Sequence, residues 1–134
     1  MIEGIMRILP AFAEIETADA DRFEQVSLRD SAGKLAESLR DPLAQYLGGS
    51  TVLMSAGNVA DPLDEEKGPV VPFGFSTDGE WAWPTYWAYF VREYGTSVPS
   101  DFLMHAQSRG FTPVELDDDE ARSAADRIQQ LLEN

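Results

Sequence analysis

The feature that most constrains the fold is a turn sequence between two short segments of alternating residues. The order Thr-Asp-Gly-Glu at residues 77–80 separates residues 70–76 from residues 80–83. Asp-Gly between such segments is the strongest short signal for a β-hairpin, because both residues accept the backbone angles of a tight turn. Trp81 and Trp83 lie two residues apart, so we expect them to share one face of the returning strand.

Helical spacing occurs on both sides of this hairpin. Residues 31–46 carry apolar side chains three and four apart, and Pro42 predicts a kink or a division into two short helices. Residues 85–94 carry an aromatic stripe, and another helix is expected to begin at Pro99. Residues 118–133 predict an amphipathic C-terminal helix. Its apolar stripe consists of Ala121, Ala124, Ala125, Ile128, Leu131 and Leu132.

Together these segments predict an α+β fold, a small antiparallel sheet with several helices on one side. Residues 51–55, β-branched and apolar after two glycines, add a buried strand, and residues 57–72 read as a loop between two halves. The first thirty residues fit no single period. Within them, residues 17–21 are a possible helix cap, and residues 11–15 are alternatively a strand.

Composition favours one folded domain over residues 1–134, because the chain is 43 % hydrophobic and shows no internal break. It has no cysteine, which excludes disulfides and thiolate metal sites and favours a cytoplasmic location. The apolar start is too short for a signal peptide or a membrane span. Met6 is an alternative start of the chain.

The net charge of −14 comes from 24 acidic and 10 basic residues, and most of the excess lies after residue 60. Such a field repels nucleic-acid phosphate and anionic membranes and attracts basic proteins. Acidity can also serve solubility alone. The charge therefore predicts a basic protein partner and no nucleic acid or membrane partner, with the oligomeric state left open.

Two acidic clusters and part of the aromatic block are the candidate contact residues. The clusters follow the predicted buried strand and precede the C-terminal helix, where acids also satisfy free amide groups. Aromatic side chains anchor many protein interfaces, although strand or helix spacing favours a core position for most of these. The predicted partner-binding residues are Asp61, Asp64, Glu65, Glu66, Asp117, Asp118, Asp119, Glu120, Trp81 and Trp87.

No pattern predicts catalysis, a metal or a cofactor. The oxygen ligands of a calcium loop do not fall at the required positions after Asp61. His105 is the single histidine, and no phosphate-binding loop or complete nucleophile elbow is present. Asp78 and Glu80 are an acid pair of the kind used in acid–base chemistry, with nothing in the sequence to fix their geometry.

One segment resembles a recurrent bacterial pattern. It runs from Phe75 through Thr-Asp-Gly-Glu-Trp-Ala-Trp-Pro, the aromatic stretch 86–94 and Pro99 to Gly110 and Phe111. It is similar to a segment of small actinobacterial-type proteins with the form TDGxWxWP, an aromatic helix, a proline and HxxxxGF. Some of these lie in the neighbourhood of polymorphic-toxin immunity proteins. The resemblance covers residues 75–111 and implies no catalytic residue.

The leading hypothesis is therefore an acidic binding module that neutralises a basic partner, specifically an immunity protein for a toxin or effector domain. One alternative is a small-ligand-binding domain or an enzyme with an aromatic-lined pocket. Another is an adaptor or structural subunit of an assembly.

Overall fold

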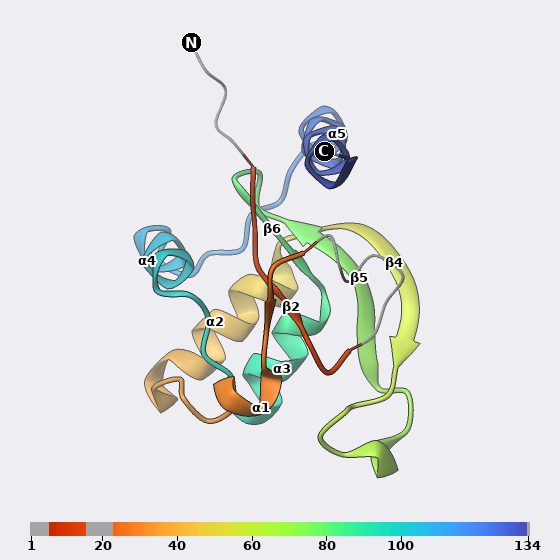
Figure 1. Cartoon of the computed structure of the whole chain (residues 1–134). Coiled ribbons are helices and arrows are strands. Elements are labelled where there is room, and N and C mark those ends of the chain that lie inside the picture. The colour runs from red at the N-terminus through yellow and green to blue at the C-terminus, as the bar shows by residue number, and fades with distance from the viewer. Residues whose placement is uncertain (1–5, 16–22, 134) are drawn as a thin grey trace.

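The computed structural model describes residues 6–15 and 23–133 and confirms the α+β fold (Figure 1). The short helix η2 is of the 3-10 type, and the other helices are α-helices. In chain order the elements are β1 (Arg7–Ile8), β2 (Ala11–Phe12), β3 (Gln25–Val26), α1 (Leu28–Ser31), α2 (Glu37–Gly49), β4 (Thr51–Val59), η2 (Glu65–Lys67), β5 (Val71–Thr77), β6 (Trp81–Pro84), α3 (Tyr86–Tyr94), α4 (Ser100–Ser108) and α5 (Asp118–Glu133).

The main sheet has the strand order β1-β6-β5-β4. β4, β5 and β6 are antiparallel neighbours, and β5 and β6 form the predicted hairpin. β1 joins β6 in parallel: the N–H of Arg7 donates to the carbonyl of Glu80 at 3.1 Å, and that of Leu9 to Ala82 at 2.9 Å. The sheet is therefore mixed, whereas the sequence predicted an antiparallel one. β2 and β3 form a separate parallel pair.

The larger core lies on the sheet face that carries Trp81 and Trp83. The indole N–H of Trp83 donates to the carbonyl of Leu47 in α2 at 3.1 Å, and the Trp81 ring lies 5.1 Å from the ring of Phe102 in α4. α3 adds its aromatic stripe to the same core. The shared face predicted for the two tryptophans is confirmed.

A smaller core covers the opposite face and consists of Met6, Ala82, Ala124 and Ile128. Ala82 lies between the two tryptophans in β6, so its side chain points to the other side of the sheet. α5 supplies Ala124 and Ile128, and its predicted bounds are confirmed. Helices cover both faces, so the expectation that they lie on one side is wrong.

Pro42 does not divide α2, which begins at Glu37 and continues to Gly49 with the proline inside it. A proline removes one backbone hydrogen bond, the one to the carbonyl four residues earlier. Burial of Leu43, Tyr46 and their neighbours against the core offsets that loss, because tertiary packing supplies most of the stability of a short helix.

β4 is longer than predicted and irregular, with register shifts between Val52 and Met54 and between Ser55 and Asn58. Gly74 of β5 permits the close approach of the two strands. A side-chain carbon at this position would lie 2.1 Å from the carbonyl oxygen of Met54, so any other residue would force the strands apart.

The N-terminal segment is fixed against α3. The indole N–H of Trp87 donates to the carbonyl of Pro10 at 2.9 Å, and the Phe12 ring lies 4.4 Å from the Trp87 ring. Of the two readings of this segment, a strand over residues 11–15 agrees with β2 in part, and the possible cap at residues 17–21 lies outside the described residues. Within the described chain, no helix is both long and apolar enough to cross a bilayer.

Candidate functional site

A hollow of about 500 Å³ lies where the turn between β5 and β6 meets the end of α4 and the first half of α5. The residues that line it come from the turn, the segment after α4 and one side of α5. They are Asp78, Gly79, Glu80, Arg109, Val114, Leu116, Asp119, Glu120, Ser123 and Arg127. We call this site the acidic hollow, because four carboxylates and two guanidinium groups line it.

The turn that forms one wall is held by its own polar groups. The Thr77 hydroxyl donates to the carbonyl of Trp81 at 2.7 Å and accepts the N–H of Gly79 at 3.0 Å. Gly79 has a φ of 98°, a backbone conformation that residues other than glycine rarely adopt. These contacts fix the direction in which Glu80 leaves the turn.

Asp78 is buried beneath the hollow, and hydrogen bonds engage both of its carboxylate oxygens. Oδ1 accepts the N–H groups of Glu80 and Trp81 at 2.9 and 2.7 Å. Oδ2 accepts the Tyr46 hydroxyl, and it lies 2.7 Å from Nε2 of His105. Burial by itself would raise the pKa of Asp78, but these hydrogen bonds together bring the pKa below its usual value. Burial, with the hydrogen bond to Asp78, raises the pKa of Tyr46.

This network answers the question that the sequence left open about Asp78 and Glu80. The Asp78 carboxylate is engaged by the backbone of the turn, by Tyr46 and by His105. A carboxylate that holds a turn together in this way is a structural group. The function of the pair therefore depends on Glu80.

Glu80 is exposed at the rim and contacts two basic residues, Arg109 and His105. Its Oε2 lies 2.9 Å from Nη2 of Arg109 and 3.5 Å from Nδ1 of His105. Burial would lower the pKa of Arg109, but the hydrogen bond with Glu80 and the nearby Tyr46 and Asp78 raise it. The second guanidinium, that of Arg127, donates to the carbonyl of Gly79 at 3.1 Å and joins α5 to the turn.

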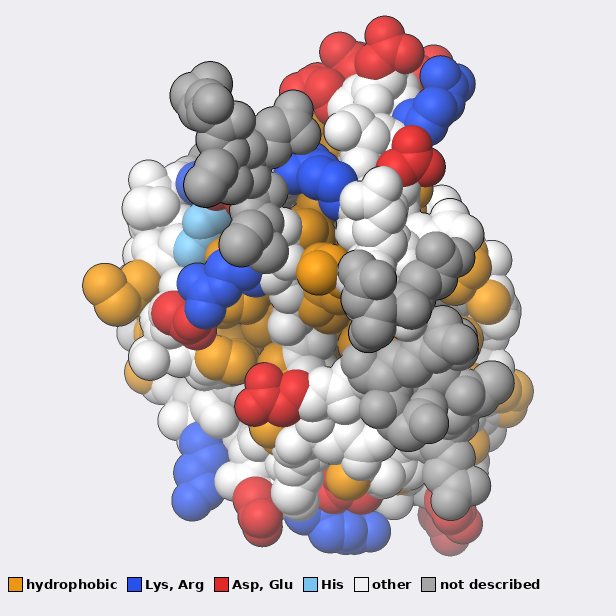
Figure 2. All heavy atoms as spheres, turned by 45° about the horizontal axis from the view of Figure 1, so that its top comes forward, with side chains coloured by type: hydrophobic (Ala, Val, Ile, Leu, Met, Phe, Trp, Pro, Cys, Tyr) orange, Lys and Arg blue, Asp and Glu red, His pale blue; other side chains and the backbone are white. Residues whose placement is uncertain are grey.

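Acidic side chains gather where α5 begins, at the top of Figure 2. The carboxylate of Asp117 accepts the N–H of Glu120 at 2.8 Å, and the carboxylate of Glu120 accepts the N–H of Asp117 at 3.2 Å. This reciprocal pair is a capping box. Asp118 and Asp119 are exposed and take no part in the box, and the Asp119 side chain is 94 % exposed. Asp119 lies 3.8 Å from the guanidinium of Arg122, and both Asp118 and Asp119 face solvent where a partner can reach them.

The other acidic cluster is not a continuation of this one. It lies in the segment between β4 and β5, at the bottom of Figure 1, whereas α5 is at the top. Glu65 and Glu66 are exposed and Asp64 is half-buried. The structure therefore separates the predicted contact residues into two surfaces.

Asp61 is buried, which corrects its assignment as a contact residue. Its Oδ2 accepts the hydroxyls of Tyr89 and Tyr94 at 2.8 and 2.5 Å, and its Oδ1 accepts the N–H of Leu63 at 2.8 Å. The ammonium of Lys67 lies 3.9 Å away. Burial acts to raise the pKa of Asp61, but the hydrogen bonds and Lys67 lower it below its usual value. A partner does not reach this carboxylate in the folded protein.

The assignment of Trp81 and Trp87 as contact residues is also corrected, because both side chains are buried in the larger core. Their spacing placed them inward, and neither ring is left at the surface to anchor a partner. Trp83 is fully buried as well. The core interpretation of the aromatic block holds for all three tryptophans.

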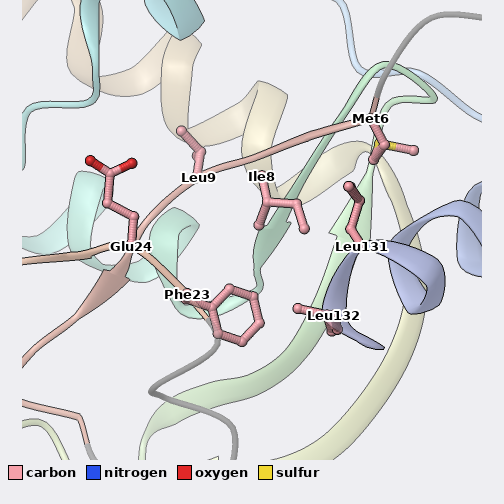
Figure 3. A pocket seen from close by; sticks show the side chains of 7 residues that line it. All are labelled: Met6, Ile8, Leu9, Phe23, Glu24, Leu131 and Leu132. Atoms are coloured by element: carbon pink, nitrogen blue, oxygen red, sulfur yellow. The ribbon is translucent and has the colours of Figure 1, made fainter. Parts of the chain in front are cut away.

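A second hollow, of about 240 Å³, lies between the N-terminal segment and the end of α5 (Figure 3). Apolar side chains line it, and Glu24 is its one charged group. The lining residues are Met6, Ile8, Leu9, Phe23, Glu24, Leu131 and Leu132. No tryptophan lines this hollow or the acidic hollow, so neither is the tryptophan-lined pocket on which the small-ligand alternative depends.

Sequence reasoning missed Glu80, Arg109 and Arg127 as members of one site. Each stands alone in the sequence, 18 or more residues from the next. The one available signal was the position of Glu80 at the end of the Thr-Asp-Gly-Glu turn, two residues after Asp78. Among the described residues, no group of three or more His, Cys, Asp or Glu side chains is placed to hold a metal ion.

Comparison of the chain with protein-family models, curated proteins and solved structures gave no match. The site is therefore interpreted from its own geometry and charge.

Proposed function

We propose that this chain is a binding protein that docks a basic protein partner at the acidic hollow and the exposed acids beside it. The observation that carries the proposal is the surplus of acid at the start of α5. The capping box needs Asp117 and Glu120, yet Glu115, Asp118 and Asp119 are also exposed there. Helix capping alone does not account for these three carboxylates.

The hollow gives this charge a shape that a cationic side chain fits. Glu80, Asp119 and Glu120 present carboxylates around a cavity whose apolar wall contains Val114 and Leu116. An arginine or lysine of the partner would place its aliphatic stem along this wall and its charge among the carboxylates. Arg109 would hold the Glu80 carboxylate in place, and Arg127 would hold the backbone of the turn from which Glu80 projects.

Long-range electrostatics support the same proposal. A net charge of −14 speeds encounter with a cationic protein and disfavours nucleic acid and anionic membranes. Neutralisation of a toxin or effector domain by covering its cationic surface is the specific role that the resemblance implies. In this proposal the chain has no catalytic role of its own.

The test is a charge-neutralised variant compared with a matched control. The variant Asp118→Asn with Asp119→Asn removes two exposed acids and spares the capping box. The control Glu37→Gln with Asp41→Asn removes two exposed acids from α2. Tagged proteins retain partners from cells that encode the chain, and titration calorimetry with the purified partner measures affinity across a range of salt concentrations.

The expected result is retention of a basic protein that leaves at high salt. Its affinity should fall by roughly 2- to 30-fold in the α5 variant, if each lost charge pair contributes about 0.2–1 kcal/mol. Its dependence on salt should also become shallower. The control should bind almost as tightly as the unmodified protein. Retention of no basic protein at low salt, or equal weakening by both variants, would contradict the proposal.

A further inference from the structure

Among the described residues, no strand pairs with the outer edge of β4 in the main sheet. β4 is the last strand in the order β1-β6-β5-β4, and it forms the outer margin of the sheet at the right of Figure 1. Residues 54–58 are all exposed, and Val52 and Met54 are 54 % and 53 % exposed. An edge strand carries backbone N–H and C=O groups that point away from its neighbour and are available to another chain.

The sequence of this edge carries neither charge nor proline, although two register shifts interrupt its pairing with β5. Residues 51–59 read Thr-Val-Leu-Met-Ser-Ala-Gly-Asn-Val, with no charged residue and no proline. Charged side chains and prolines are common devices that keep edge strands from pairing. The register shifts twist the strand, yet the whole edge remains uncharged.

The two acidic clusters lie at the two ends of this strand. At its start, the Thr51 hydroxyl donates to the carbonyl of Val114 at 3.1 Å and accepts the N–H of Leu116 at 2.8 Å, which places Asp117 and its neighbours there. At its end, Val59 leads within a few residues to Asp64, Glu65 and Glu66. β4 itself is nine residues long, and a regular strand of that length spans about 27–30 Å.

We propose that β4 is the edge on which the basic partner docks, by addition of an extended segment of the partner to the sheet. The segment has an uncharged centre, which forms backbone hydrogen bonds with β4, and lysine or arginine residues at both ends, which meet the two acidic clusters. This inference rests on the proposed function and adds the form of the partner's contact segment to it.

Charge complementarity selects this occupant over a second copy of the chain. Antiparallel pairing of two β4 strands would set the start of one strand against the end of the other. Residues 117–119 of one copy would then face residues 64–66 of its partner, and like charges would meet at both ends. A segment with basic ends turns the same two contacts into attractions.

The experiment uses the full chain and a designed peptide with two lysines at each end and alternating threonine and valine between them. Hydrogen–deuterium exchange followed by NMR measures protection of each backbone amide with and without the peptide. Three variants are compared by affinity: Glu65→Gln with Glu66→Gln, Asp118→Asn with Asp119→Asn, and the control Glu37→Gln with Asp41→Asn. A second peptide carries glutamate in place of lysine.

The expected result is peptide-dependent protection of β4 amides and roughly 2- to 30-fold weaker binding when either end is neutralised. The control variant and the glutamate peptide should show no such effects.

Ala56→Pro provides an independent check. Residue 56 lies between the paired positions 55 and 58, where no residue of β5 is registered opposite, and a proline there would block strand addition. If this variant fails to fold in a thermal melt, the charge variants decide the matter.

Three results would overturn the inference, and each has a different meaning for the proposed function. If the lysine peptide binds and only the α5 variant weakens it, the acidic hollow is a site and β4 is not. If a basic protein binds the chain but the peptide fails to bind, strand addition is wrong and the proposed function stands. If β4 is protected without peptide and the mass doubles in sedimentation, a second copy occupies the edge.

Discussion

The chain contains two kinds of aspartate, each with other acids nearby in the sequence, and their roles are opposite. Asp61 and Asp78 are each followed by proline or glycine and a nearby acid, and both side chains are fully buried. Asp118 and Asp119 belong to a denser acidic stretch, residues 115–120, and are exposed. The difference is in the partners: tyrosine hydroxyls and backbone N–H groups surround the buried pair, whereas the exposed pair faces solvent and Asp119 has Arg122 beside it, at 3.8 Å. Acidic residues in this sequence therefore include two buried carboxylates that hold the fold together as well as those of the exposed surface at the start of α5.

Removal of the Asp78 carboxylate should have the largest effect in this comparison. Asp78→Ala leaves the Tyr46 hydroxyl and the N–H groups of Glu80 and Trp81 without their acceptor. We expect the free energy of unfolding to fall by about 3–5 kcal/mol, the usual cost of breaking a buried charged network. Urea denaturation measures it. A loss no larger than that of Asp119→Ala would mean that burial does not separate the two kinds of aspartate.

Asp61→Ala should follow, with a loss of about 2–4 kcal/mol, because two tyrosine hydroxyls lose their acceptor. A double-mutant cycle with Tyr94→Phe isolates one of these contacts. Once Asp61 is absent, deletion of the Tyr94 hydroxyl should have little further effect on stability. Full additivity of the two substitutions would show that the hydrogen bond contributes nothing.

The buried pair should also determine how stability depends on acid pH. Each folded-state pKa is lowered, so the stability that each carboxylate contributes is complete above the unfolded pKa, near 3.9, and is lost as pH falls through the folded value. Below about pH 4 the free energy of unfolding should therefore decline. Asp61→Asn and Asp78→Asn should each make this decline shallower, whereas Asp119→Asn should leave it unchanged. Chemical denaturation at a series of pH values would show whether the slopes differ.

The smallest effect concerns two neighbours at the start of α5. Asp117→Ala removes one side of the capping box and should lower stability by about 1 kcal/mol. Asp118→Ala, one residue later, should leave the melting temperature close to that of the unmodified protein. Equal melting temperatures for the two variants would indicate that the box does not stabilise the helix.

Local patterns predicted the hairpin, the two inward tryptophans and α5, because each depends on the spacing of residues close together in the sequence. The same reasoning failed for the placement of β1 and of α5 on the second face. β1 is only two residues long, and its pairing with β6 joins positions far apart in the chain. No local period encodes such a contact.

The candidate site was predictable in part for the same reason. The exposed acids after residue 116 follow from composition, and their helix-capping role follows from the Asp-x-x-Glu spacing of Asp117 and Glu120. The burial of Asp61 could not be predicted in this way, because its role as a hydrogen-bond acceptor depends on Tyr89 and Tyr94, about thirty residues later. The gathering of Glu80, Arg109 and Arg127 likewise depends on the fold.

The burial of all three tryptophans in one core gives the protein an uneven optical signal. Trp81, Trp83 and Trp87 report on the face of the sheet that α2, α3 and α4 cover, and the small core beneath α5 contains none of them. Fluorescence emission would therefore follow the opening of the larger core, while detachment of α5 would leave the emission almost unchanged. Circular dichroism would register that detachment as lost helix, so separate transitions in the two signals would identify α5 as an independently melting unit.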